Sequence, residues 1–189
     1  MKQFNFLPKI FTAATVISLL SVQSCTKIAS QLQYNLDMHS GSVTVVIPPA
    51  SNTSSETTIG AGANNINVDS FVKAHTAGLL GAANILSVKL TSCTMTLENG
   101  NTNNSFANLQ SCSASFASNT EVSPYKTSLV SNPDVFSTSI SLPVDTAAEL
   151  KNYLLGNQYN YTLGGKLRRA TTDTLKCTIN FHYRLRVQG

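Results

Sequence analysis

The sequence predicts an all-β protein: an antiparallel β-sandwich of immunoglobulin-like or jelly-roll-like type, with about eight strands and one or two short helices. Three observations support this. Charged residues make up 12% of the 189 residues and hydrophobic residues 42%, which is too little charge for a helical bundle and too apolar for a disordered chain. Apolar and polar residues alternate with a period of two in several segments. Turn-forming residues separate these segments at spacings typical of sandwiches.

The first 24 residues have the pattern of a signal peptide. A short, weakly basic stretch, Met1–Lys9, precedes the apolar run Ile10–Val22. A helix over that run would reach about 20 Å, which is shorter than a bilayer core of about 30 Å. The pattern therefore favours a cleaved leader over a permanent membrane span.

The leader ends at Val22-Gln23-Ser24-Cys25, which resembles the lipobox of bacterial lipoproteins. The resemblance implies that Cys25 is acylated, and two or more acyl chains anchor a protein stably to a membrane. Thr26, which is not Asp, implies sorting to the outer membrane under the rules of that family. We expect a lipoprotein signal peptide over residues 1–24, an anchor and short linker over 25–30, and a single domain over 31–189, located in the bacterial cell envelope.

The strands of the first half of the domain follow from alternation and from β-branched runs. Gln31–Met38 alternates, and Val43–Ile47 is a β-branched run that ends at two prolines. Ile85–Leu97 is long, and its apolar phase shifts near Thr91 and Ser92, which predicts a β-bulge. Further strands are expected at Phe106–Phe116 and Phe136–Val144, and a loop with room for one short strand at Ser51–Asn67.

The clearest alternation lies near the C-terminus. Leu175–Val187 alternates over its whole length, and Tyr159–Arg168 shows the same period of two. The polar stretch Arg169–Asp173 joins these segments. A hairpin that pairs Leu167 with Leu175 keeps both apolar sets on one face, so the sequence predicts that these two strands are neighbours.

Two short helices are predicted from capping patterns. Thr146 and Glu149 have the spacing of a capping box, and Gly156 falls where a C-terminal cap belongs. Asp69 is expected to cap a second, shorter helix through Ser70–Ala74.

Three cysteines remain once Cys25 is assigned to the anchor, and all three would lie in an oxidising compartment. A hairpin around the loop Asn99–Ser105 would place Cys93 opposite Cys112, at a separation close to that of a disulfide. A pairing with Cys177 and three reduced, buried thiols are the alternatives.

The sequence contains no motif that predicts an enzyme, a cofactor or a metal site. His39, His75 and His182 do not show the short spacings of metal ligands, and His182 is expected on the solvated face of the last strand. Nucleophile-elbow and phosphate-loop motifs are also absent. Without Lys2 and Lys9 of the leader, eleven basic residues face nine acidic ones, and this balance argues against a nucleic-acid partner.

Basic residues mark one candidate binding surface. Lys166, Arg168, Arg169 and Lys176 are expected to converge on the last hairpin, where they would bind an anion such as an acidic glycan or a lipid headgroup. The alternative is a charged edge that prevents sheet-to-sheet aggregation.

Two threonines are candidate modification sites. Asp145-Thr146-Ala147 and Asp173-Thr174-Leu175 resemble the Asp-Ser/Thr-apolar acceptor of a general O-glycosylation system found in some bacteria. The resemblance implies a glycan on Thr174, which lies in a turn, or on Thr146.

The expected function is a lipid-anchored, extracytoplasmic and non-catalytic module with a structural, adhesive or interaction role, meeting a protein or glycan through its loops. One alternative is a carbohydrate-binding module, which would need Tyr125, Tyr153 and Tyr159 exposed on one face. The other is a small extracytoplasmic hydrolase, which would need His39 or His75 beside a carboxylate in a pocket.

Overall fold

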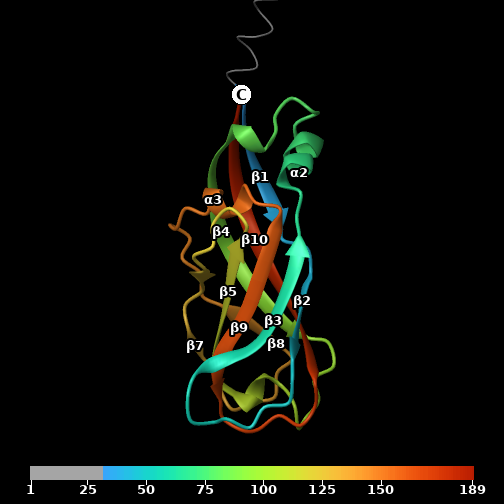
Figure 1. Cartoon of the computed structure of the whole chain (residues 1–189), viewed down its shortest axis with the longest axis vertical. Helices are drawn as coiled ribbons and strands as arrows, with labels where there is room; N and C mark the ends of the chain where they lie inside the picture. The colour runs from blue at the N-terminus through green and yellow to red at the C-terminus, as the bar shows by residue number, and fades with distance from the viewer. Residues whose placement is uncertain (1–31) are drawn as a thin grey trace, which may run out of the picture.

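The computed structural model describes residues 32–189, which form an antiparallel β-sheet that curls into two layers (Figure 1). The all-β, antiparallel sandwich prediction is confirmed, with ten strands in the described residues in place of about eight. The strands are β1 Gln33–His39, β2 Val43–Ile47, β3 Thr57–Asn65, β4 Ile85–Leu97, β5 Leu109–Ser118, β6 Tyr125–Lys126, β7 Val130–Ser131, β8 Ser139–Leu142, β9 Gln158–Leu167 and β10 Leu175–Gln188. The helical segments are α2 Val68–His75, α3 Lys151–Leu154 and the 3-10 turns η1 Ala82–Asn84 and η2 Phe106–Asn108.

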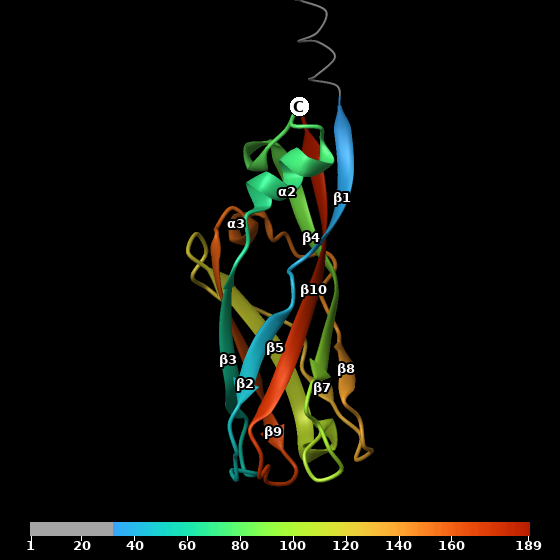
Figure 2. The same cartoon turned by 90° about the vertical axis from the view of Figure 1, so that its right-hand side faces the viewer.

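The sheet has the strand order β6-β5-β9-β3-β2-β10-β4-β8, with β1 paired to β10 and β7 paired to β5. It bends between β2 and β3, whose pairing is limited to Val46 and Ala61. Beyond the bend, β5 and β9 face β10 across the core (Figure 2). The ring centroid of Phe116 lies 5.1 Å from that of Phe181, and Tyr161 lies 5.8 Å from the same ring. Aromatic contacts between the layers therefore form the centre of the sandwich.

Strand β10 is the central strand of one layer. It spans 14 residues and pairs with β1, β2 and β4. Every second side chain is buried, which confirms the predicted alternation: Leu175, Cys177, Ile179, Phe181, Tyr183, Leu185 and Val187. Strands β2 and β4 also have the predicted bounds.

The predicted bulge in β4 is present. The register with β10 shifts between His182, opposite Ser92, and Tyr183, opposite Leu90. Thr91 is the extra residue, and its hydroxyl donates to the carbonyl of His182 at 3.0 Å. The extra residue keeps apolar side chains on the core face on both sides of the bulge.

Both predicted hairpins are wrong. β9 pairs with β5 and β3, whereas β10 pairs with β1, β2 and β4, so Leu167 and Leu175 are not cross-strand partners. In the same way β4 and β5 are not neighbours in the sheet. In each case the loop carries the chain from one layer to the other. Alternation identifies the buried face of a strand but not its partner, and facing layers satisfy the same pattern as adjacent strands.

The sequence predicts a loop with at most one short strand over Ser51–Asn67, because glycine and asparagine disfavour strands. The structure instead has the nine-residue strand β3 within this segment. The structure explains the glycines by close backbone approach at the bend. A Cβ at Gly60 would lie 2.7 Å from Cγ1 of Val45, and a Cβ at Gly62 would lie 2.6 Å from the carbonyl oxygen of Thr44. Glycine therefore lets β3 lie against β2 where the sheet turns.

The helix caps differ from the prediction. The amide oxygen of Asn67 caps α2 by accepting from Ser70 N at 2.8 Å. Asp69 instead accepts from Ala82 N at 2.9 Å and forms an ion pair with Lys73 at 2.6 Å. No described helix has the length and hydropathy needed to cross a membrane.

The predicted helix from Thr146 begins later and is shorter. Thr146 lies in a turn, and α3 starts at Lys151. The Glu149 carboxylate accepts from Lys151 N at 3.1 Å and also from Val88 N of β4 at 2.7 Å. Leu155, and not Gly156 as predicted, is the C-cap of α3, and Gly156 follows it.

Candidate functional site

The predicted basic patch does not converge. Lys166 lies on β9 opposite Ser111 of β5, while Lys176 lies on β10 opposite Val46 of β2. β9 and β10 belong to different layers and do not form the hairpin that would bring these basic residues together. Arg168 and Arg169 remain together in the loop after β9.

The two arginines are used to hold loops in place. Arg169 makes a two-point contact with the Asp134 carboxylate at 2.9 and 2.6 Å, and this pairing lowers the pKa of Asp134. Arg168 donates to the carbonyls of Ala107 at 2.8 Å and Asn132 at 2.6 Å. Their donors are thus engaged by protein oxygens, which argues against the predicted free anion site.

Three loops meet at the end of the sandwich farthest from the C-terminus, at the bottom of Figure 1. We call residues 98–108, 131–138 and 168–174 the distal loop end. Two buried amides join its loops. Asn104 Oδ1 accepts from Thr172 N at 2.8 Å while its Nδ2 donates to Asp173 at 2.9 Å. Asn108 Nδ2 donates to the carbonyl of Ala170 at 3.0 Å.

The distal loop end also exposes apolar side chains. Val135 is 65% exposed and Phe136 is 54% exposed, next to Asp134 in the loop before β8. Sequence reasoning placed Phe136 at the start of a buried strand, but the strand begins at Ser139. Val135 and Phe136 are therefore candidate contact residues for a partner.

The candidate glycosylation residues are both exposed. Thr174 lies just before β10, where its carbonyl accepts from Asn99 Nδ2 at 2.9 Å, so it belongs to the distal loop end. Thr146 lies in the turn before α3. Cys25, the candidate lipidation residue, lies outside the described residues.

The three remaining cysteines are free thiols in the core. Cys93, Cys112 and Cys177 are all buried, and burial raises the pKa of each thiol to about 12. The predicted Cys93–Cys112 bond is not formed, and the hairpin that was expected to place the two residues opposite each other is also absent, since β4 and β5 are not neighbours in the sheet.

The three candidate sugar-stacking tyrosines do not form a flat exposed array. Tyr159 is buried. Tyr125 and Tyr153 are partly exposed but pack on Phe116, with ring centroids 5.5 and 5.3 Å away. The Tyr153 hydroxyl donates to the carbonyl of Ser123 at 2.7 Å. The rings of Tyr125 and Tyr153 therefore pack against the core and do not form a platform for a sugar.

The histidines are placed in two separate regions. His75, on α2, contacts the carbonyl of Phe71 through Nδ1 at 2.8 Å. His39 and His182 are cross-strand partners whose ring centroids lie 4.1 Å apart. Burial, and then the charge of His39, lower the pKa of His182. Within residues 32–189, no three His, Cys, Asp or Glu side chains are grouped as a metal site.

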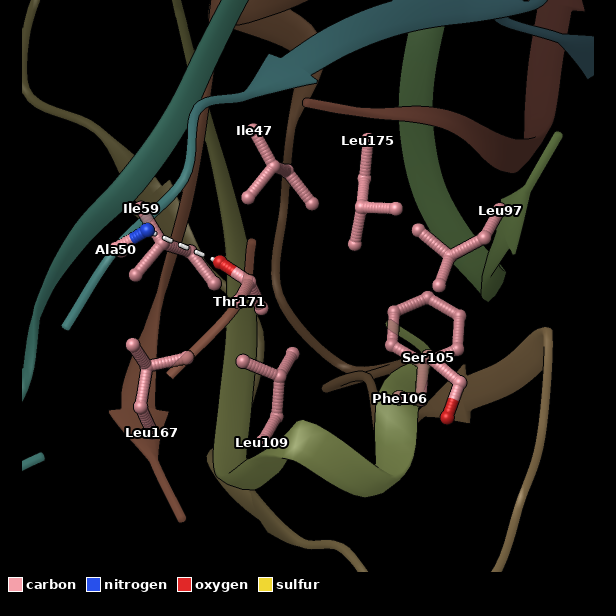
Figure 3. A pocket seen from close by; sticks show the side chains of 10 residues that line it. All are labelled: Ile47, Ala50, Ile59, Leu97, Ser105, Phe106, Leu109, Leu167, Thr171 and Leu175. Carbon is pink, nitrogen blue, oxygen red and sulfur yellow. Dashed lines mark hydrogen bonds between the residues drawn. The ribbon is translucent and has the colours of Figure 1, made fainter. Parts of the chain in front are cut away.

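A small apolar cavity lies between the layers near the distal loop end (Figure 3). Its volume is about 10 Å³, room for about one water molecule, and a cavity with so few polar groups stays dry. A hydrogen bond from Ala50 N to Thr171 Oγ1 at 3.0 Å lies at one side. The lining residues are Ile47, Ala50, Ile59, Leu97, Ser105, Phe106, Leu109, Leu167, Thr171 and Leu175. This space is a packing defect too small for a substrate.

Comparison with known proteins yields no family and only distant shape similarity. No protein-family model matches the chain, and no curated protein matches it. One similar solved structure is from Desmodium yellow mottle tymovirus, with 13% identity, a TM-score of 0.27, and coverage of 84% of this chain and 90% of that chain. Another is the capsid of Helicobacter pylori bacteriophage KHP30, with 9% identity, a TM-score of 0.27, and coverage of 82% and 100%.

Proposed function

We propose that the protein is a lipid-anchored, extracytoplasmic module of the bacterial cell envelope, without catalytic activity, that meets a protein or glycan partner through the distal loop end. The anchor part rests on the likeness of Val22–Cys25 to a lipobox. The binding part rests mainly on one observation: exposed Val135 and Phe136 lie on a loop that Arg168 and Arg169 hold in place through Asn132 and Asp134.

The arrangement of the termini supports an anchored orientation. The backbone amide of Gly189 donates to the carbonyl of Leu32 at 3.1 Å, so the start of β1 and the C-terminus lie at one end of the sandwich (Figure 1). Gln33 follows Cys25 by eight residues, which span at most about 30 Å when extended. A lipid on Cys25 would keep this end near the membrane and present the distal loop end away from it.

The rigidity of the distal loop end supports a binding role. Loops already ordered by Arg168, Arg169, Asn104 and Asn108 lose little conformational entropy when a partner binds. Exposed apolar residues beside a satisfied polar rim match the composition of protein interfaces.

The anchor is tested by metabolic labelling with a fatty-acid analogue. We expect label on the wild-type chain and none on Cys25→Ala, while Cys93→Ala, a buried-thiol control, keeps the label. Protease treatment of intact cells then reports whether the domain is surface-exposed or faces the periplasm. An unlabelled wild-type chain with an uncut leader would contradict the anchor.

The binding end is tested by replacing single residues with a photo-crosslinking amino acid in living cells. A crosslinker at Phe136 is expected to give a discrete adduct, whereas one at Leu155, exposed directly after α3 and outside the distal loop end, is expected to give none. Adducts at Leu155 but not at Phe136 would place the partner elsewhere and overturn this part of the proposal.

A further inference from the structure

The junction of β1 and β2 brings two histidines into contact on the outer face of the sheet. β1 and β2 pair in succession with the same edge of β10, to residues 182–188 and 175–179 respectively. Between them the chain turns through Gly41, whose φ is +72°. His39 is the last residue of β1, directly before this break, and lies opposite His182.

The register explains why the rings are so close. The amide of Ser40 donates to the carbonyl of Phe181 at 2.9 Å, so the adjacent pair, His39 and His182, does not exchange backbone hydrogen bonds. Side chains at such positions of an antiparallel ladder are nearer than at hydrogen-bonded positions. The ring centroids are 4.1 Å apart, with planes at 72°.

The ring nitrogens of this pair remain available. His75 uses Nδ1 on a backbone carbonyl, but in the described residues no protein hydrogen bond engages a ring nitrogen of His39 or His182. The nearby Asp37 and Arg184 satisfy each other through an ion pair at 3.1 Å. His39 is exposed and His182 partly exposed, so an ion can reach both rings.

We propose that His39 and His182 form a two-imidazole site for a borderline divalent transition ion, with Zn²⁺, Ni²⁺ or Cu²⁺ as its chemical class. Imidazole nitrogen suits these ions. Two nitrogens bound to one Zn²⁺ at about 2.0–2.1 Å each lie within a few ångströms of each other, a separation that adjacent rings reach by side-chain rotation. Water completes the coordination, since Asp37 is held by Arg184.

A bound ion would fasten the end of β1 to β10. Among the described strands, β1 hydrogen-bonds to β10 alone, so its attachment depends on one ladder. A ligand that binds the folded protein and not the unfolded chain stabilises the fold in proportion to the logarithm of its concentration. The ion therefore stabilises the edge strand that follows the N-terminal segment, whether or not Cys25 carries a lipid.

The test is a Zn²⁺ titration of the full chain in detergent, with the melting temperature and the histidine Cε1–H NMR signals as readouts. In the wild type we expect one ion per chain, a Tm that rises with Zn²⁺ concentration, and movement of two of the three histidine signals. His39→Ala and His182→Ala should each abolish the saturable Tm rise. His75→Ala and Cys25→Ala should retain it.

The NMR readout needs no variant, so the proposal stays testable if His182→Ala fails to fold. Absence of a saturable shift in the wild type would overturn it. A Tm rise that persists in His39→Ala, or that is lost in Cys25→Ala, would also overturn it by placing the ion elsewhere. Failure of lipid labelling leaves this result unchanged, because the site does not use Cys25.

Discussion

Glu149 shows how one side chain outside regular structure joins two elements. Its carboxylate accepts from Val88 N and Ser87 Oγ of β4, both at 2.7 Å, and from Lys151 N at the start of α3. Burial acts to raise the pKa of Glu149, but the hydrogen bonds from Val88, Ser87, Lys151 and Lys89 together outweigh it, so the pKa lies below its usual value. The ionised form therefore stabilises the folded chain.

Glu149→Gln is expected to lower the free energy of unfolding at pH 7 by on the order of 1 kcal/mol, because a charged acceptor becomes a neutral one. The folded pKa is below the unfolded value of about 4.3, so the stabilisation is present above that pH and is lost as pH falls through the folded pKa. Urea unfolding at pH 7 and pH 3 checks this. An equal difference between variant and wild type at both pH values would contradict it.

Arg168 and Arg169 show that the partners of a charged residue cannot be identified from the local sequence. Sequence reasoning treated both as free cations, but the chain supplies Asp134 and two loop carbonyls as partners. Asp134 is 34 residues before Arg168, and local pattern cannot reveal a partner at that distance. A lone charge in a sequence is thus a weak guide to a binding site.

At the scale of elements, glycine positions decide how closely strands approach. β9 contains Gly164 and Gly165 side by side. A Cβ on Gly165 would collide with the carbonyl oxygen of Ser111 in β5, whereas a Cβ on Gly164 would meet Ser113 Oγ at 3.4 Å, an ordinary contact. The two positions form a matched pair.

Gly165→Ala is expected to destabilise the fold by about 1–3 kcal/mol, because backbone must shift to relieve the overlap. Gly164→Ala should be neutral or stabilise by about 0.4–1 kcal/mol, because it reduces the entropy of the unfolded chain. Chemical denaturation of both variants measures the difference. Equal effects, or a larger loss for Gly164→Ala, would show that the β5–β9 approach does not limit this strand.

For the whole molecule, the core combines aromatic contacts between layers with three buried thiols. Phe116 of β5 contacts Phe181 and Tyr183 of β10 at 5.1 and 6.1 Å between centroids. Cys93, Cys112 and Cys177 occupy small positions in the same core. The sandwich is therefore held by apolar packing and backbone pairing, with no disulfide among residues 32–189.

In the Cys25→Ala variant, the three remaining cysteines are expected to be unreactive towards a thiol reagent at neutral pH. Burial blocks access to each thiol and raises its pKa to about 12. After denaturation without reductant, all three should react. If only one thiol reacts, the other two cysteines form a disulfide, and Cys93–Cys112 is then one of the three pairings to be considered.

The sequence by itself determined the features that depend on local pattern. These are the all-β class, the buried faces of β4, β9 and β10, and the bulge at Thr91. Alternation with a period of two indicates which side chains point inward, and a phase shift indicates where a strand has one extra residue. Both patterns can be recognised within a single strand, without knowledge of its partners.

Only the tertiary structure decided which strands are partners. It placed β9 and β10 in opposite layers, turned a Gly-rich segment into β3, and brought His39 beside His182 across 143 positions. Alternation is satisfied equally by adjacent strands and by facing layers. The choice between them depends on long-range burial, in which the aromatic rings of β5, β9 and β10 pack against each other.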